Sequence, residues 1–595
     1  MSDIDDPFAG LSQVGEDLDA AGFDFPSETE QTPDAMDDLI AQCAQFDLND
    51  DGNGRRFVTY FGQDLMFVPR VGWFSWTGRF WQADRDEIDV MRKSQLVAPL
   101  VKREVFFVSL SGRQMELVST EAALRAERAD LSSRTGVDGT ADHEAQARID
   151  RIDTELREIA KLQKTHAELR AAHRRFAVQT GNSTRMKSMR EEASVRLARD
   201  LEDLDAGPLD LNTQTGVLRF SVDRIDGARY ARVDLLEHAR DQLITKLMPV
   251  TWIPDPDQEP AACPRFDAFF ERIQPDREMR DFLMRWFALS LTGLVEQKLC
   301  FFYGMGANGK SVLVDLMARI AGDYAATAKI ESLTGTNRRG GGDATPDLVP
   351  LIGARLVRAA EPDEGMRWQE GLIKDLTGGE PILVRSLHKD FVEVRPRFSL
   401  TISGNHKPDI RGTDDGIWRR LLLVPFNVQI PKEEQIPKEE LDDILYAERD
   451  GIFARLVQSL MEYLERGLCE PASVTKATNE FRSESDPYGS FLDEACVVTG
   501  DPEDTLAARD LVNAFHFWLA QRAEGAFKDR TVSLALKDRS RRWVSRRTGK
   551  RFTERKSNGT MRYDGIRYAE LFGRHWKNVA KDAQGRAIAS VAEAE

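Results

Sequence analysis

"FFYGMGANGKSVLVDLMARI", residues 301–320, places three glycines, a lysine and a serine between two apolar runs. Several glycines in one connection indicate that the backbone wraps closely around something, because a residue without a Cβ adopts conformations that other residues avoid. The segment Gly304-x-x-x-x-Gly309-Lys310-Ser311 is a complete Walker A pattern, with an expected strand at 299–303 and an expected helix at 311–320. The pattern predicts that the chain binds a nucleoside triphosphate.

Each part of this pattern has a physical role toward phosphate. The glycines let several backbone N–H groups turn toward the phosphates. Lys310 brings a point charge to the β and γ oxygens, and the Ser311 hydroxyl takes a coordination position on Mg²⁺. We therefore expect ATP and Mg²⁺ as the cofactors. The residues expected to hold the nucleotide are Gly304, Gly306, Ala307, Asn308, Gly309, Lys310, Ser311 and Val312.

Hydrolysis also needs an acid that orients water, and "GARLVRAAEPDEG" at 353–365 offers Glu361 at the end of an apolar strand. Asp363 and Glu364 are close enough to remain alternatives. Ala360 stands where many P-loop ATPases place a second acid. We therefore expect Mg²⁺ to rest mainly on Ser311, phosphate oxygens and water, with Glu361 beside it.

Two further strands supply polar candidates. "FSLTISGN" at 398–405 ends in Asn405, whose amide can hold the γ-phosphate or the attacking water, although an asparagine there is often only a turn former. "GIWRRLLLVPF" at 416–426 puts Arg419 and Arg420 at the start of another apolar strand. Adjacent strand side chains point to opposite faces, so one of the two is expected to act as an arginine finger toward a neighbouring subunit. Arg420 is the preferred one.

Composition sets limits on the class of protein. A chain of 595 residues is too long for one core, and 41% hydrophobic with 30% charged residues is typical of a globular protein. Five scattered cysteines without CxxC spacing indicate reduced thiols, not a zinc site or a disulfide frame. No apolar run approaches the length needed to span a bilayer. We expect a cytoplasmic location, in a bacterial or virus-infected host cell, and no membrane partner.

Charge is unevenly distributed along the chain. Residues 1–54 hold fifteen acidic residues and no lysine or arginine, whereas residues 526–556 hold twelve lysines and arginines against three acids. The net charge of −17 therefore belongs mostly to the N-terminal segment. A basic run is most often a solvated face, but the helix, helix and hairpin pattern around this one predicts a winged-helix-like domain that contacts DNA.

The pattern of elements predicts several folded parts. Residues 149, 152, 156 and 159 are apolar at 3-4-3 spacing, which predicts a helical hairpin with a narrow apolar seam. Trp73, Trp76 and Trp81 lie in a short β-rich stretch and are expected to fill its core, with base stacking as the alternative. The expected segments are an acidic disordered tail (1–53), an N-terminal α+β domain (54–260) with the hairpin at about 113–200, a helical collar or linker (261–297), an ATPase domain (298–483), a winged-helix-like basic domain (484–580) and a tail (581–595). Within the first tail, "PDAMDDLIAQCAQF" at 33–46 indicates a short helix.

Five motifs occur in a fixed order: "GMGANGKS", "RLVRAAEPDEG", "IKDLTGGEPILVRSLHKDF", "LTISGNHKP" and "DDGIWRRLLLVPF". In this order they resemble the superfamily 3 helicases, and more narrowly the phage and plasmid primase-helicase branch that includes the poxvirus enzyme. The resemblance covers about residues 57–480. It implies an α/β fold with an AAA+-like P-loop ATPase core and a homo-hexameric ring that translocates on single-stranded DNA, with ATP sites between subunits.

The resemblance also points to residues that contact DNA. The family's DNA-contacting hairpin falls on "GGEPILVRSLHKDF", residues 378–391, so Arg385, His388 and Lys389 are candidates, with a plain surface hairpin as the alternative. This chain has Glu380 where the family commonly has an aspartate after two glycines, which is a conservative departure.

Partners follow from the same comparison. Single-stranded and forked DNA are the expected substrates. Many relatives carry a primase domain in front of the ATPase, where this chain has the acidic segment, so a separate primase or single-strand-binding protein is an expected partner. Two other classes stay open: a different ring motor such as a DNA-packaging ATPase, and a small-molecule P-loop kinase. The kinase alternative leaves Arg419, Arg420 and the basic C-terminal end without a role.

Overall fold

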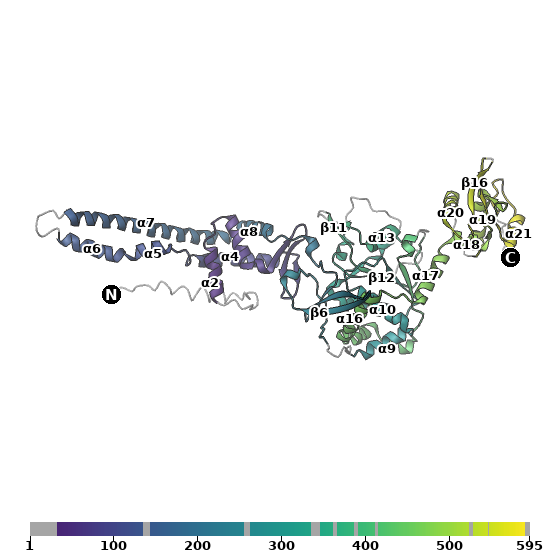
Figure 1. Ribbon diagram of the computed structural model, residues 1–595, viewed down its shortest axis with the longest axis horizontal. Helices are drawn as coiled ribbons and strands as arrows, with labels where there is room; N and C mark the ends of the chain where they lie inside the picture. The colour runs from purple at the N-terminus through teal and green to yellow at the C-terminus, as the bar shows by residue number, and fades with distance from the viewer. Residues whose placement is uncertain are drawn as a thin grey trace. The chain divides into compact units, whose positions relative to one another are not determined.

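The computed structural model describes residues 33–134, 143–254, 262–334, 345–360, 366–385, 391–410, 415–522, 527–545, 547–557 and 559–588 (Figure 1). The chain forms two compact units, Met1–Ala206 with His238–Thr245, and Gly207–Glu237 with Lys246–Glu595. Within the described residues, every helix is too short or too polar to cross a lipid bilayer. The fold class is mixed α/β.

The first unit is mostly helical and carries one small antiparallel sheet of order β1-β2-β3. Trp73 and Trp81 of this sheet are buried and Trp76 is half-buried, so the expectation that the tryptophans fill a small core is confirmed. The elements are α2 (Pro33–Cys43), α3 (Asp50–Phe61), β1 (Leu65–Val68), β2 (Gly72–Trp76), β3 (Trp81–Asp84), α4 (Ile88–Glu104), α5 (Gly112–Ser119), α6 (Glu121–Arg134), α7 (His143–Thr180) and α8 (Ser183–Arg196).

Residues 33–53 differ from the expectation of a disordered acidic tail, because α2 and the start of α3 are folded. The Ile40 and Cys43 side chains of α2 are fully buried in the helical core. The Asn49 side chain accepts a hydrogen bond from the Gly52 N–H at 2.7 Å and so caps α3. Burial of apolar side chains among the acids stabilises this segment. Residues 1–32 lie outside the described residues.

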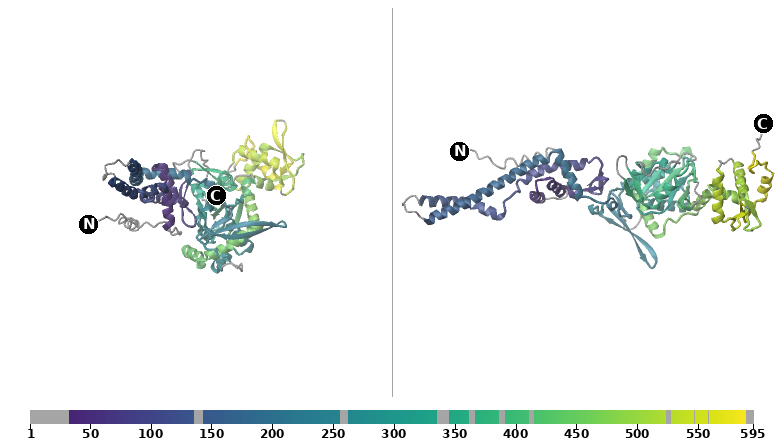
Figure 2. Two further views of the ribbon diagram at one scale, coloured as in Figure 1. Left: turned by 60° about the vertical axis from the view of Figure 1, so that its left-hand side comes forward. Right: turned by 90° about the horizontal axis from the view of Figure 1, so that it is seen from above.

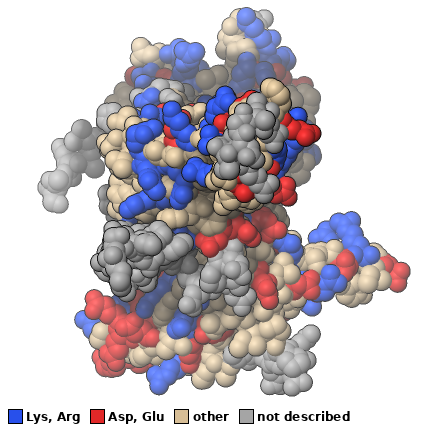
Figure 3. Space-filling model, turned by 90° about the vertical axis from the view of Figure 1, so that its left-hand side faces the viewer, with Lys and Arg blue, Asp and Glu red and all other residues tan. Residues whose placement is uncertain are grey.

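The predicted helical hairpin is formed by α6 and α7. Leu124, Ile152 and Ile159 are buried between the two helices, which confirms the apolar seam. Ion pairs join the helices along its edges, with Arg128 to Asp153 at 2.5 Å as one of them. A view from this side of the molecule shows basic and acidic side chains interspersed (Figure 3).

A buried ion pair ties α3 to α4 in the first unit. The Arg56 Nε donates to both carboxylate oxygens of Glu104, at 2.9 and 3.0 Å, and both side chains are fully buried. The same guanidinium donates to the carbonyls of Cys43, Phe46 and Asp47. Arg56 therefore joins α2, α3 and α4 through one side chain.

The second unit holds a parallel sheet and several smaller sheets. The elements up to the end of that parallel sheet are β4 (Asp210–Asn212), β5 (Val217–Ile225), β6 (Ala228–Leu236), α9 (Pro264–Ile273), α10 (Arg277–Leu289), β7 (Leu299–Tyr303), α11 (Lys310–Ala321), β8 (Ala325–Ala328), α12 (Ile330–Leu333), β9 (Leu356–Ala359), α13 (Glu370–Gly378), β10 (Ile382–Val384), β11 (Val392–Val394), β12 (Ser399–Gly404), α14 (Asp415–Trp418) and β13 (Leu421–Pro425).

The remaining elements of this unit follow β13. They are α15 (Lys438–Tyr446), α16 (Arg449–Arg466), α17 (Ala472–Glu484), α18 (Pro487–Glu494), β14 (Cys496–Val498), β15 (Thr505–Ala507), α19 (Ala508–Ala520), α20 (Asp529–Arg542), β16 (Thr553–Ser557), β17 (Thr560–Asp564), β18 (Ile566–Tyr568) and α21 (Glu570–Asn578). The β5–β6 hairpin stands out from the rest of its unit, and its distal residues 223–230 are exposed (Figure 2).

Five parallel strands form the sheet that positions the candidate site, in the order β13-β7-β12-β9-β8. Side chains alternate across β7, so Cys300 and Phe302 enter one core while Leu299 and Phe301 enter the other. Helices cover both faces, as is usual for a parallel sheet. Burial raises the pKa of the Cys300 thiol, so this thiol stays protonated and inert.

Candidate functional site

The glycine-rich loop connects the end of β7 at Tyr303 to the start of α11 at Lys310. A Cβ on Gly304 would lie 2.2 Å from the Phe426 carbonyl oxygen. Gly309 has φ of 78°, and a Cβ there would lie 2.5 Å from Cγ2 of Ile273. The two glycines that define the sequence pattern are therefore required by close packing and, at Gly309, by left-handed backbone as well.

The segment 426–430, which we call the strap, is hydrogen-bonded to the glycine-rich loop and to the end of β7. The Phe426 N–H donates to the Tyr303 carbonyl at 2.7 Å, and the Ile430 N–H donates to the Ala307 carbonyl at 2.8 Å. The buried Asn308 amide donates to the carbonyls of Met305 and Phe426. Ala307 has φ of 58°, an unusual conformation for a residue with a Cβ, and the strap stabilises it.

Lys310 is buried to 4% exposure at the first position of α11. Its Nζ donates to the Gly304 carbonyl at 2.5 Å and to Oδ1 of Asn405 at 3.2 Å. In the paired strands, Tyr303 of β7 lies opposite Gly404 of β12, so Asn405 lies directly beside the loop. The structure thus brings together three residues that are far apart in the sequence.

The first turn of α11 presents the remaining loop residues. Ser311 is exposed and Val312 is half-buried, whereas a Cβ added to Gly306 would meet nothing within 4 Å. Gly309 gives the start of this helix no side-chain cap, and the Lys310 N–H donates to Oδ1 of Asn308 at 3.4 Å. A buried ammonium, a helix amino end and a loop whose backbone is packed closely at Gly304 and Gly309 fit a phosphate group, and the exposed Ser311 hydroxyl fits a coordination position on Mg²⁺.

The expected acidic residues lie outside the described residues. The strand β9 ends at Ala359, which lies opposite Ile402 of β12, and Glu361, Asp363 and Glu364 fall in the undescribed segment that follows. In the described ranges, no group of three or more histidine, cysteine, aspartate or glutamate side chains is arranged to hold a metal ion. Glu361 therefore remains a prediction.

Arg419 and Arg420 lie at the opposite end of the sheet from the loop. In the parallel pair of β13 and β7, Leu421 lies opposite Leu299, five residues before the loop begins at Gly304. At about 3.3 Å per residue, the two ends are about 16 Å apart. Neither arginine is thus placed to reach phosphates bound in the loop of its own chain.

The two arginines differ in their surroundings. Arg420 is 7% exposed, and its Nη1 donates to the Gly416 carbonyl at 2.7 Å. Arg419 is exposed, and its Nη2 lies 3.4 Å from Oε1 of Gln297, an oxygen that Arg420 also approaches. Arg420, which the sequence favours as the arginine finger, is therefore the side chain that is buried and hydrogen-bonded within its own chain, whereas Arg419 is exposed to solvent.

The predicted DNA-contacting hairpin is formed by β10 and β11, which pair antiparallel with Ile382 opposite Val394. Arg385 lies at the end of β10, where its N–H donates to Oγ1 of Thr345 at 2.8 Å and its guanidinium stacks over the Phe391 ring at 4.8 Å. His388 and Lys389 lie outside the described residues. Arg385 thus lies just past the pair of Val384 and Val392, at the end of the hairpin that leads into its connecting segment.

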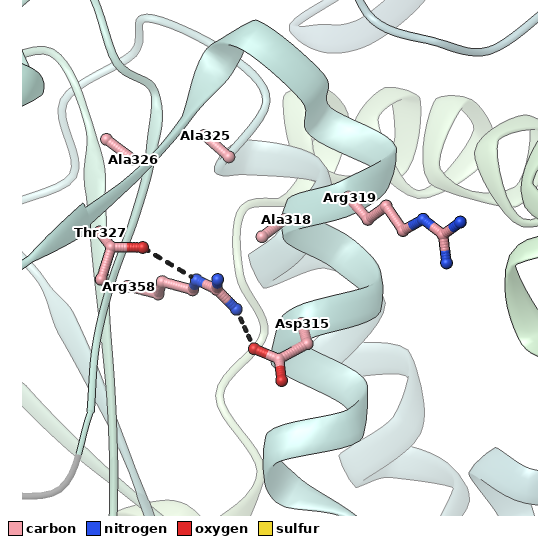
Figure 4. Close-up of a pocket in the computed structure, with 7 residues that line it drawn as sticks. All are labelled: Asp315, Ala318, Arg319, Ala325, Ala326, Thr327 and Arg358. Atoms are coloured by element: carbon pink, nitrogen blue, oxygen red, sulfur yellow. Dashed lines mark hydrogen bonds and ion pairs between the residues drawn. The ribbon is translucent and has the colours of Figure 1, made fainter. Parts of the chain in front are cut away.

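A cavity of about 370 Å³ lies beside α11 (Figure 4) and was not expected from the sequence. Arg358 of β9 points across it and forms an ion pair with Asp315 of α11, and its Nε donates to Oγ1 of Thr327 at 3.2 Å. No residue of the glycine-rich loop lines it. The residues that line it are Asp315, Ala318, Arg319, Ala325, Ala326, Thr327 and Arg358.

Comparison with known protein families matches two segments of the chain. Residues 54–275 match the family described as D5 N terminal like, and residues 302–420 match a family of unknown function (DUF5906). The second match spans the glycine-rich loop, β9, β12 and the arginine pair. With the relatives described next, these matches support the family that the ordered motifs indicate, the D5-like primase-helicases of phages and viruses.

Three curated relatives are proteins of viruses. A protein of Acanthamoeba polyphaga mimivirus named "Putative helicase L207/L206" is 28% identical over 278 residues, which is 44% of this chain and 29% of the relative. "Putative helicase 022R" of Frog virus 3 (isolate Goorha) is 29% identical over 268 residues, 42% of this chain and 27% of the relative. "Putative primase C962R" of African swine fever virus (strain Badajoz 1971 Vero-adapted) is 20% identical over 336 residues, 53% of this chain and 34% of the relative.

The matched part of the chain spans about a third or less of the length of these relatives. Among solved structures, the apo C-terminal region of NrS-1 is 14% identical and covers 58% of this chain and 96% of that chain, with a TM-score of 0.33. A TM-score this low carries no argument about the present fold.

Proposed function

We propose that this chain is an ATP-dependent DNA helicase of a phage or mobile-element replication system. The observation that carries the proposal is the position of the Lys310 ammonium, held between the Gly304 carbonyl and Asn405, which directly follow the adjacent parallel strands β7 and β12. The strand order supports an AAA+-like P-loop ATPase core. The names of the viral relatives support a role in replication.

In the proposed reaction, Lys310 leaves the Gly304 carbonyl and neutralises charge on the β and γ oxygens of ATP. Ser311 and Glu361 would hold the Mg²⁺ ion, which would offset the phosphate charge. Glu361 orients the attacking water, and the Asn405 amide positions that water or the γ-phosphate. Asn405 already touches Lys310, so the two side chains act on the same end of the nucleotide.

We propose that the active form is a ring of six subunits with ATP sites between neighbours. The separation between the arginine pair and the loop of the same chain supports this arrangement, because an arginine about 16 Å away cannot neutralise a γ-phosphate. A neighbouring subunit can supply Arg419 or Arg420 in its place. Arginine fingers commonly contribute about 10³-fold or more in rate.

The ring would pass single-stranded DNA along the β10–β11 hairpin, with Arg385, His388 and Lys389 contacting the DNA backbone. The contacts of Arg385 with Thr345 and Phe391, just past the last strand pair of the hairpin, support a role in holding the hairpin's shape. Lys389→Ala should therefore lower DNA-stimulated hydrolysis and unwinding while leaving ATP binding intact. Equal loss of ATP binding would contradict a role in DNA contact.

The test of the central proposal is ATP hydrolysis with and without single-stranded DNA. Lys310→Ala should abolish hydrolysis, and DNA should stimulate the wild-type rate. A small-molecule kinase would be indifferent to DNA and active as a monomer. A DNA-packaging motor would hydrolyse ATP on duplex DNA but would not separate a forked substrate, so an unwinding assay distinguishes it.

A mixing experiment tests the shared site and decides between the two arginines. Arg419→Ala and Arg420→Ala are each mixed with Lys310→Ala, because a true finger variant regains activity where an intact loop meets an intact arginine. Since Arg420 is buried and hydrogen-bonded to Gly416, unfolding of Arg420→Ala by urea must be followed in parallel. A monomer that hydrolyses ATP at the full rate would remove the ring from the proposal.

Two further parts of the proposal concern the rest of the chain. The helices α18 to α20 with the three-stranded sheet of order β15-β17-β16 support a winged-helix-like C-terminal domain. A separate primase or single-strand-binding protein is the proposed partner of the helicase at a replication fork. Pull-down with the replication proteins of the same element, with the acidic residues 1–32 deleted as the comparison, tests that partnership.

A further inference from the structure

The C-terminal part of the second unit has a surface to which neither family match extends, since the matches end at residues 275 and 420. Here α19 and α20 are followed by the β16–β17 hairpin, and β17 lies in the middle of the sheet between β15 and β16. One apolar core, including Phe515 of α19, Leu536 of α20 and Tyr563 of β17, joins these elements. In a helix-turn-helix arrangement the second helix is the one that enters the major groove of DNA.

The buried side of α20 identifies its outward side. Val532, Leu536 and Arg539 are buried, and the Arg539 guanidinium is occupied by Asp486 at 2.5 Å. At 100° per residue, the side chains opposite this buried stripe are those of residues 530, 534, 537 and 541. The outward stripe of α20 is therefore Arg530, Leu534, Lys537 and Arg541.

The neighbouring strand β16 adds to the same side. Lys537 of α20 forms an ion pair with Glu554 of β16 at 3.2 Å, which shows that the Glu554 side chain faces α20. Lys556 is two residues further along the strand, so it points to the same face as Glu554. The surface formed by Arg530, Leu534, Lys537, Arg541 and Lys556 is called the α20 face below.

Charge on the α20 face is largely unneutralised. Among the described residues, no carboxylate forms an ion pair with Arg530, Arg541 or Lys556, all of which are exposed. Other basic side chains nearby are occupied, such as Arg555 by Asp564 at 2.5 Å. The cations that remain lie along one helix and one adjoining strand, where a phosphate backbone can follow them.

We propose that the α20 face binds duplex DNA, with α20 in the major groove. A helix of 14 residues is about 21 Å long and fits a groove about 12 Å wide. Leu534, 58% exposed between the cations, provides an apolar contact of the kind made to thymine methyl groups. Single-strand sites stack bases on aromatic rings, and the α20 face has no aromatic residue. This proposal does not depend on hydrolysis or on a ring.

The experiment uses the full chain carrying Arg530→Ala together with Arg541→Ala. Binding is measured by fluorescence anisotropy, without nucleotide, on a duplex of about 20 base pairs, roughly two helical turns, and on an oligothymidine of equal length. Loss of two phosphate contacts should weaken duplex binding by about ten- to a hundredfold and lower the slope of log K against log salt by about 2. Oligothymidine binding should stay within about twofold of wild type.

Two controls keep the result interpretable. Arg567→Ala with Arg574→Ala removes two exposed arginines of β18 and α21 in the same part of the chain, and should leave duplex binding unchanged. Arg530→Lys with Arg541→Lys keeps the charge and should keep the salt slope. Urea unfolding of each variant shows whether a loss of binding is a loss of folding.

Three results would overturn the proposal. The first is unchanged duplex binding by the double variant of Arg530 and Arg541, and the second is an equal loss of affinity for duplex and for oligothymidine. The third is that the chain binds no duplex but binds an acidic peptide of residues 1–32 at the α20 face. The last result would make this face a protein contact. Lys310→Ala should bind duplex as wild type does, so failure of the proposed ATPase and failure of this proposal are separate outcomes.

Discussion

Gly309→Ala tests whether the loop described here is the conformation that binds nucleotide. Gly309 has φ of 78°, where a side chain costs about 1–2 kcal/mol. The added methyl would also lie 2.5 Å from Cγ2 of Ile273, a side chain that is fully buried. Overpacking of this kind costs about 1–3 kcal/mol. Together these terms oppose the binding conformation by about 2–5 kcal/mol, which is at least roughly a thirtyfold loss of affinity for Mg-ATP.

A double variant separates the two terms. Gly309→Ala with Ile273→Ala removes the close contact but leaves the backbone strain, so it should regain the packing part and remain about 5- to 30-fold weaker than Ile273→Ala alone. Affinity is measured by titration with a fluorescent ATP analogue, and urea unfolding of each variant separates binding from folding. Wild-type affinity in Gly309→Ala would refute the loop conformation, and failure of the double variant to recover would refute the packing explanation.

Three further predictions concern other parts of the chain. Arg56→Met leaves the Glu104 carboxylate buried without the Arg56 guanidinium and should lower the free energy of unfolding by about 3–5 kcal/mol. The double variant Arg56→Met/Glu104→Leu should recover stability. An unchanged urea midpoint in Arg56→Met would show that water reaches Glu104. Asn405→Ala should bind ATP within a few-fold of wild type but hydrolyse it at least about tenfold more slowly, since it positions and does not bind; normal turnover would contradict this. The hydrogen bond from Arg148 holds the pKa of Glu127 below its usual range. The pair therefore stabilises the α6–α7 hairpin above the ordinary glutamate pKa of about 4.3, and this stabilisation is lost as the pH falls through the lowered pKa of Glu127. Protection of the α6 and α7 amides from hydrogen exchange, taken relative to the intrinsic exchange rate at each pH, should therefore fall at acid pH in wild type, and an equal fall in Arg148→Met would exclude the pair as the cause.

Patterns local in sequence were sufficient for much of the fold. Residue spacing in the sequence was enough to recognise the glycine-rich loop between β7 and α11. It was also enough to recognise the apolar seam that contains Ile152 and Ile159. The short helix indicated at 33–46 is confirmed by α2, but the packing of residues 33–53 into a core was not visible in this way. Its acidic composition hides Ile40 and Cys43, which are buried only because α3, α4 and α8 supply the other side of the core.

The candidate site was predictable in its members but not in their arrangement. Strand order brings Asn405 to Lys310, and the sequence contains no direct signal for which parallel strands are neighbours. The preference for Arg420 over Arg419 depended on which face of the chain each side chain takes at the start of β13. That depends on the packing of Gly416 and Gln297, which come from two different segments. The cavity beside Asp315 likewise depends on tertiary packing between α11 and the sheet.

β13 connects the arginine pair to the strap. The arginine pair is attached at its amino end, and the strap that holds the glycine-rich loop begins at Phe426, directly after its carboxyl end. Backbone hydrogen bonds to β7 run along its length, so the strand resists bending and moves as one piece. In the proposed ring, a neighbour's nucleotide that pulled on the arginines would also pull on the strap, so the state of one ATP site would reach the next through a single strand.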